Sequence, residues 1–161
     1  MPETKDIPGV IAPPPLIALA AVVVGLLFDW LLPAYLLATV LSFWERVVIG
    51  VLVMIAGAGL AVAARRRFIE AGTNENPWKP ALRLATAGVY RYVRNPMYVG
   101  LILMAAGIGI ALASDWTLVL LVPAAFVLHR GVVLREERYL ETKFGEDYRH
   151  YKASVAKWGI W

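Results

Sequence analysis

The chain has 161 residues, of which 60% are hydrophobic and only 17% are charged, and its formal net charge is +4. Soluble domains are about 45–50% apolar and about 25% charged, so this composition is typical of a membrane protein and excludes a disordered chain. The absence of cysteine excludes disulfides, cysteine-ligated metal sites and a thiol nucleophile.

The predicted elements begin with a tail, residues 1–15, in which five prolines favour irregular structure and no removable signal peptide is indicated. Four apolar runs follow, each of at least 17 residues, which is about the lower limit for crossing a bilayer core of roughly 30 Å. The predicted membrane spans are 16–32, 47–64, 97–113 and 116–134. A short apolar stretch, 34–44, either lies in the membrane interface or extends a neighbouring helix.

Basic residues predict the orientation of these spans. Of the 16 lysines and arginines, one lies in the tail, seven lie in residues 65–97 and seven lie from Arg130 onward, at or beyond the end of the fourth span, which leaves only Arg46 on the opposite side. The positive-inside rule therefore places both termini and the 65–97 loop in the cytoplasm. The sequence predicts an all-α integral membrane protein of the prokaryotic inner membrane or of eukaryotic endomembranes. It has about four transmembrane helices in one membrane-embedded domain, 16–161, with a cytosolic loop and a C-terminal helical extension.

The fourth span continues without a helix breaker into polar sequence that contains Arg130, Arg135, Glu136 and Glu137. Seven residues separate Arg130 from Glu137, so a regular helix would place them on one face as an ion pair. Glu136 would point about 100° away from Glu137. The simplest interpretation is a solvated, salt-bridged helix face. The functional interpretation is a carboxylate that binds a cation near the apolar boundary, where screening is weak.

Two sequence blocks resemble a known family. Residues 86–100 read TAGVYRYVRNPMYVG, close to the pattern T-x-G-x-Y-x-x-x-R-(H/N)-P-x-Y-x-G, and residues 136–151 read EERYLETKFGEDYRHY. A weaker match is AGTN at 71–74. Together they resemble the isoprenylcysteine carboxyl methyltransferases and the related phospholipid methyltransferases. The resemblance covers roughly residues 50–155 and does not specify the substrate.

The resemblance implies an S-adenosylmethionine-dependent methyltransferase whose cofactor lies in a cytosol-facing pocket rather than in a Rossmann fold. Glu136 would bind the charged end of the cofactor. Asn95 stands where the isoprenylcysteine enzymes often have histidine. Val132 aligns with the arginine that contacts the substrate in those enzymes. Arg130 or Arg135 would take over that role, so both are expected as catalytic residues beside Glu136. The other cofactor-binding positions carried over are Leu82, Arg83, Leu84, Ala85, Tyr90, Asn95, Pro96, Met97 and Tyr98.

The expected acceptor is a lipid or a lipid-linked small molecule, either a phospholipid amine or an isoprenyl or other lipid carboxylate. No metal and no nucleic acid is expected as a partner, and the sequence indicates no oligomeric state. Two alternatives stay open. The pattern also resembles the NADPH-dependent sterol reductases, although those enzymes have many more spans, and a non-enzymatic helical scaffold would use the same residues only for structure.

Overall fold

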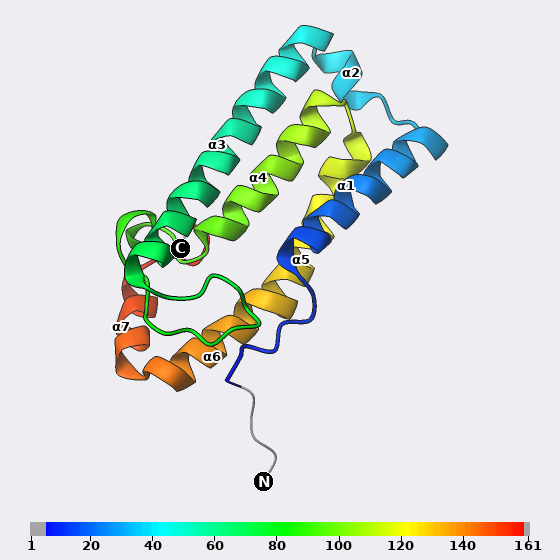
Figure 1. Ribbon diagram of the computed structural model, residues 1–161. Coiled ribbons are helices and arrows are strands. Elements are labelled where there is room, and N and C mark those ends of the chain that lie inside the picture. The colour runs from blue at the N-terminus through cyan, green and yellow to red at the C-terminus, as the bar shows by residue number, and fades with distance from the viewer. Residues whose placement is uncertain (1–5, 160–161) are drawn as a thin grey trace.

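The computed structural model describes residues 6–159, and the described residues form helices and loops without a strand (Figure 1). This confirms the all-α prediction. The elements in chain order are α1 (Pro14–Leu31), α2 (Leu36–Val40), α3 (Phe43–Ala71), the 3₁₀ turn η1 (Gly88–Arg91), α4 (Pro96–Ala111), α5 (Asp115–Leu128), the π-helical turn η2 (His129–Val133), α6 (Leu134–Phe144) and α7 (Glu146–Ser154).

The apolar helices match the predicted spans, with different ends. Three of them are long and apolar enough to cross a bilayer, namely α1, α3 and the continuous helix Asp115–Phe144, and α4 is a shorter apolar helix of 16 residues. The chain is therefore an integral membrane protein. Pro14 and Pro15, expected in the tail, instead form the first turn of α1, where proline has no N–H to leave unpaired. The predicted tail residues 1–5 lie outside the described part.

Helix α3 is longer than the predicted span 47–64 because capping residues, and not the limits of the apolar run, determine where it begins and ends. Ser42 and Glu45 form a capping box at its N-terminus, and Gly72, at φ 66°, ends it. The three arginines at 65–67, which follow the predicted span 47–64, belong to this helix. Its polar last turns therefore extend beyond the apolar part, toward the loop that follows.

Two glycine pairs hold α3 against its antiparallel neighbour α4. Gly50 lies opposite Gly107 and Gly57 lies opposite Gly100, and a Cβ added to any of them would come within 2.5–2.6 Å of the facing carbonyl oxygen. Inside a bilayer such small residues allow the close backbone approach that stabilises a helix pair. Gly59 has no atom within 4 Å of an added Cβ, so it takes no part.

At the other end of the bundle, residues 34–44 form neither a span nor one continuous extension. The short helix α2 starts where the Asp115 carboxylate accepts hydrogen bonds from the Leu36 and Leu37 amides, at 2.7 and 3.0 Å. Residues 43 and 44 belong to the first turn of α3. Trp30 and Trp44 are 78% and 72% exposed here, as expected of aromatic residues at a membrane interface.

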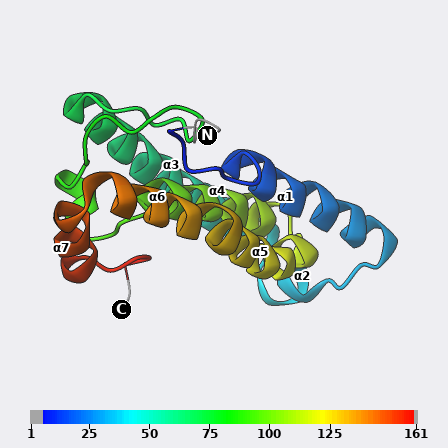
Figure 2. The ribbon, with the colours of Figure 1, turned by 90° about the horizontal axis from the view of Figure 1, so that it is seen from below.

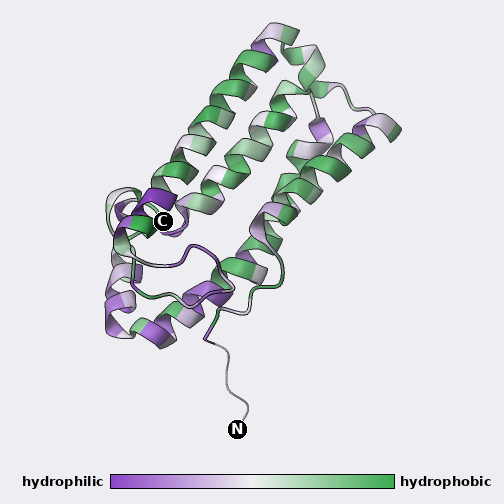
Figure 3. Cartoon of the chain, in the orientation of Figure 1, coloured by the Kyte–Doolittle hydropathy of each residue, from purple (hydrophilic) through white to green (hydrophobic). Residues whose placement is uncertain are grey.

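The last apolar helix continues through η2 into the polar helix α6, as predicted, and α7 then turns back (Figure 2). The 134–144 segment reads LREERYLETKF and lies beyond the apolar part of this helix. Figure 3 shows that hydrophilic residues gather at this end of the molecule, on α6, α7 and the loop that follows α3. The architecture thus places the two sequence blocks at one polar end.

Candidate functional site

A pocket lies at the polar end, between the 72–87 loop, the first turn of α4, α6 and α7. The empty space in the pocket is about 870 Å³ when the open solvent at its mouth is included. Residues from both sequence blocks line it, together with one residue of the tail, Pro8, and one of α3, Phe68. Segments that are far apart in the chain therefore form one site.

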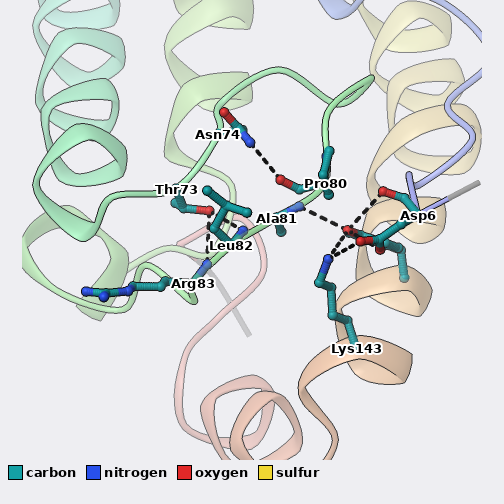
Figure 4. A network of polar contacts seen from close by, with 9 residues as sticks. Asp6, Thr73, Asn74, Pro80, Ala81, Leu82, Arg83 and Lys143 are labelled. Carbon is teal, nitrogen blue, oxygen red and sulfur yellow. Dashed lines mark hydrogen bonds and ion pairs between the residues drawn. The ribbon is translucent and has the colours of Figure 1, made fainter.

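The loop that supplies one wall is folded by Thr73 and Asn74 (Figure 4). The Thr73 hydroxyl accepts hydrogen bonds from the amides of Leu82 and Arg83, at 2.9 and 3.2 Å. The Asn74 side chain donates to the carbonyl of Pro80 at 2.8 Å. The weaker sequence match at 71–74 thus has a structural role, because it brings the 82–85 segment back beside the pocket.

Tyr90 forms the floor of the pocket on the turn η1. It is only 5% exposed, and its ring packs edge-on against Phe68 with centroids 5.5 Å apart. Its carbonyl accepts a hydrogen bond from the Tyr151 hydroxyl at 2.8 Å. Burial is the main cause that raises the pKa of the Tyr90 phenol far above its usual value, so the ring presents a neutral aromatic wall.

The segment before α4 is held by the C-terminal end of the described chain. The amide of Arg94 donates to the Ala156 carbonyl, and the Asn95 side chain donates to the Lys157 carbonyl, both at 3.0 Å. Asn95 occupies the cap position of α4, but its side chain does not cap the helix. The buried Pro96 then begins the helix at a position that needs no N–H donor.

Glu137 anchors the same segment through a buried cluster of charges. Its carboxylate lies 3.0 Å from the Arg94 guanidinium and 2.9 Å from the Lys157 ammonium, although the Arg94 contact is not aligned as a hydrogen bond. The predicted pair between Arg130 and Glu137 is wrong. The π turn at 129–133 holds one extra residue, which rotates the following helix by about 100°. Arg130 instead lies over the Phe126 ring, 5.2 Å from its centroid.

Glu136 points into the pocket and has no cationic partner among the described residues. The Tyr98 hydroxyl donates to its carboxylate at 2.6 Å. Burial, the largest cause, raises the pKa of the Glu136 carboxyl to about 7, against the lowering effect of the Tyr98 hydrogen bond. A carboxylate removed from water without a paired cation is costly, so this arrangement favours binding of a positively charged group.

The structure brings nearly all predicted cofactor positions together. Leu82 is the exception: its side chain is 59% exposed and does not line the pocket. Whether the others contact a cofactor stays a prediction. The predicted positions that line the pocket are Arg83, Leu84, Ala85, Tyr90, Asn95, Pro96, Met97, Tyr98 and Glu136.

Arg130 and Arg135, predicted beside Glu136, lie outside the pocket. Arg135 donates to the carbonyl of Gly9 in the tail at 2.9 Å. Sequence reasoning missed Tyr139, which lines the pocket, and the structural role of Glu137. Nothing in the local sequence around Tyr139 distinguishes it from a solvated helix residue. In the described part of the chain no group of three or more acidic or histidine residues is arranged to hold a metal ion.

Comparison with known proteins relates most of the chain to one family. A family model described as phospholipid methyltransferase matches residues 45–147, more than half of the chain. The protein-S-isoprenylcysteine O-methyltransferase of Schizosaccharomyces pombe is 33% identical over 72 residues, which are 45% of this chain and 30% of that enzyme. An uncharacterized protein of Haemophilus influenzae is 34% identical over 62 residues, 38% of this chain and 98% of that protein. No solved structure matches the chain.

Proposed function

The chain belongs to the phospholipid methyltransferase family, and on that premise we propose that it transfers a methyl group from S-adenosylmethionine to a lipophilic acceptor in the membrane. The family is one of methyltransferases that act on lipids. The matched region covers less than a third of the curated yeast enzyme. Both the cofactor and the acceptor of this chain are therefore proposals.

The observation that carries the proposal is the unpaired Glu136 in the pocket wall. S-adenosylmethionine has an ammonium on its amino-acid end and a methyl group activated by a positively charged sulfur. Glu136 would pair with the ammonium, held in place by the Tyr98 hydroxyl. The aromatic rings of Phe68 and Tyr90 in the same pocket suit a cation, because a ring face attracts positive charge. The donor set therefore fits this cofactor.

The remaining residues need only orient the reactants and exclude water. Methyl transfer is an in-line displacement in which the acceptor forms a bond to the methyl carbon as the carbon–sulfur bond breaks. Alignment of two bound reactants can supply much of the rate enhancement. The buried Glu137 cluster and the hydrogen bond from Tyr151 to Tyr90 tie the segments that line the pocket to one another, which supports this role.

The valine at position 132 favours an amine acceptor over a carboxylate. An anionic acceptor needs a nearby cation. Arg94 is paired with Glu137, and Arg130 and Arg135 lie outside the pocket, but Lys79 and Arg83 line it, so the pocket charges alone do not distinguish the two acceptors. Val132, which replaces the substrate-contacting arginine of the isoprenylcysteine enzymes, is fully buried. We therefore favour a phospholipid amine, delivered from the membrane while the cofactor enters from the cytoplasm.

Calorimetry on the purified protein in lipid nanodiscs tests the cofactor. We expect S-adenosylhomocysteine to bind and NADPH not to bind. The reverse result would favour the sterol-reductase alternative, and no binding of either would favour the scaffold. Incubation with methyl-labelled S-adenosylmethionine and a membrane lipid extract, followed by mass spectrometry, then tests the acceptor. Label in an amine headgroup supports the proposal, whereas label only in lipid carboxylates would overturn the amine assignment.

A further inference from the structure

Residues 6–11 of the N-terminal tail are bound along one face of η2 and α6, beside the pocket. The Ile11 amide donates to the Gly131 carbonyl at 3.2 Å, and the Gly9 carbonyl accepts from Arg135 at 2.9 Å. Asp6 contacts residues 139 and 143. The helix positions used, 131, 135, 139 and 143, are four residues apart, so the tail runs antiparallel to the helix along a single face.

Tyr139 joins this tail to the loop that lines the pocket (Figure 4). Its hydroxyl accepts hydrogen bonds from the Ala81 amide and from the Lys143 ammonium, each at 3.0 Å, and donates to the Asp6 carboxylate at 2.9 Å. A phenol hydroxyl has one donor and two acceptor sites. All three are occupied within this junction, so the hydroxyl connects the tail, the loop and Lys143 at once.

The tail and the loop, which Tyr139 joins, each form part of the wall of the candidate site. Ala81 and residues 83–85 line the pocket from the loop, Pro8 lines it from the tail, and Tyr139 also lines it and is bonded to both segments. Lys143 reinforces the junction, because its ammonium also lies 2.5 Å from the Asp6 carboxylate. A movement of the tail therefore acts on the loop through one hydroxyl group.

We propose that Tyr139 is a positioning residue whose hydroxyl couples closure of the N-terminal tail over the pocket to placement of the 81–85 segment. This inference rests on the proposed function, since the segment is a predicted cofactor wall. In the closed state the tail narrows the pocket mouth and the loop presents its cofactor-lining face. Cofactor exchange requires the bonds of Asp6 to Tyr139 and Lys143 to break.

Hydrogen exchange measured by mass spectrometry on the nanodisc-bound protein tests the coupling without any ligand. Tyr139→Phe keeps the ring beside Lys143 and removes only the hydroxyl. We expect amide exchange in peptides covering residues 6–11 and 78–85 to become about fivefold faster, the effect of losing roughly one hydrogen bond. Tyr92→Phe is the matched control, because Tyr92 is 78% exposed and lies outside the pocket. Unchanged exchange in either segment of Tyr139→Phe would overturn the coupling.

Cofactor binding tests the positioning role separately. For Tyr139→Phe we expect the KM for S-adenosylmethionine to rise about fivefold while kcat stays within about twofold of the wild type. Asp6→Asn should have a smaller effect alone and add little to Tyr139→Phe, since both changes break the same junction. Faster exchange with an unchanged KM would overturn the positioning role. If the wild type binds no S-adenosylhomocysteine, the proposed function fails, and the exchange experiment still decides whether the tail and loop are coupled.

Discussion

Glu136 and Glu137 are neighbours on α6, yet only Glu137 is paired with cations, at 3.0 Å from Arg94 and 2.9 Å from Lys157, while Glu136 contacts the Tyr98 hydroxyl. The rotation of about 100° between successive helix residues turns Glu136 toward Tyr98 and Glu137 toward Arg94 and Lys157, although both glutamates line the pocket. Their functions are therefore separable by mutation.

Glu136→Gln should weaken binding of S-adenosylhomocysteine by roughly 10- to 150-fold. This range follows from losing a hydrogen bond to a charged group, typically about 1.5–3 kcal/mol. Calorimetry measures the change. Glu141→Gln, on the same helix but paired with Lys152 away from the pocket, is the control and should change the affinity less than about threefold. Equal small losses in both variants would contradict the assigned role of Glu136.

Glu137→Gln should chiefly reduce stability. It leaves the Arg94 and Lys157 charges without their counterion in a buried site, and breaking such a cluster typically costs about 3–5 kcal/mol. Thermal unfolding in detergent should show a clear drop in Tm. Glu146→Gln, which breaks only the exposed pair with Arg149, should leave Tm nearly unchanged. A Glu137→Gln variant as stable as the wild type would argue against the anchoring role.

The affinity for the cofactor should depend on pH through Glu136. Because only the carboxylate form pairs with an ammonium, and the pKa of Glu136 is raised to about 7, binding should be tightest above pH 7. It should weaken by up to about tenfold for each pH unit below that value. In Glu136→Gln this dependence should disappear. Calorimetric titrations between about pH 5 and pH 8 test both statements, and a wild-type affinity independent of pH would contradict them.

The glycine contacts between α3 and α4 predict that alanine lowers the stability at position 57 but not at position 59. Gly57→Ala places a methyl group 2.6 Å from the Gly100 carbonyl oxygen, whereas Gly59→Ala meets nothing within 4 Å. Forcing the helices apart should cost about 1–3 kcal/mol, while the second change should be nearly neutral. Thermal stability in detergent compares the two, and equal stability would show that the helices do not pack through Gly57.

The orientation can be tested because the natural chain has no cysteine. Thr39 and Thr142 are a matched pair of exposed threonines at opposite ends, each bonded to a carbonyl of its own helix, at 2.8 and 2.9 Å. In intact cells an impermeant maleimide should label Thr39→Cys, and it should label Thr142→Cys only after permeabilisation. Labelling in the opposite pattern would place the pocket outside the cytoplasm.

The sequence by itself determined what depends on composition and short spacing. Apolar runs of bilayer length identified the four hydrophobic helices, and the residues around Tyr98 and Glu136 identified the two blocks that meet in the pocket. These signals are local, because hydrophobic length and motif order can be read along the chain without knowing which helices are neighbours.

Only the tertiary structure decided which groups meet. The π turn at 129–133 separated Arg130 from Glu137, and contacts over long sequence separations gave Glu137 its partners Arg94 and Lys157. Gly57 and Gly59 look alike in the sequence, yet only Gly57 faces a backbone. Tyr139 bonds to a tail residue more than 130 residues earlier in the chain. Each of these pairings depends on helix rotation, and a shift of one residue, about 100°, decides whether a side chain faces the pocket, the interior or solvent.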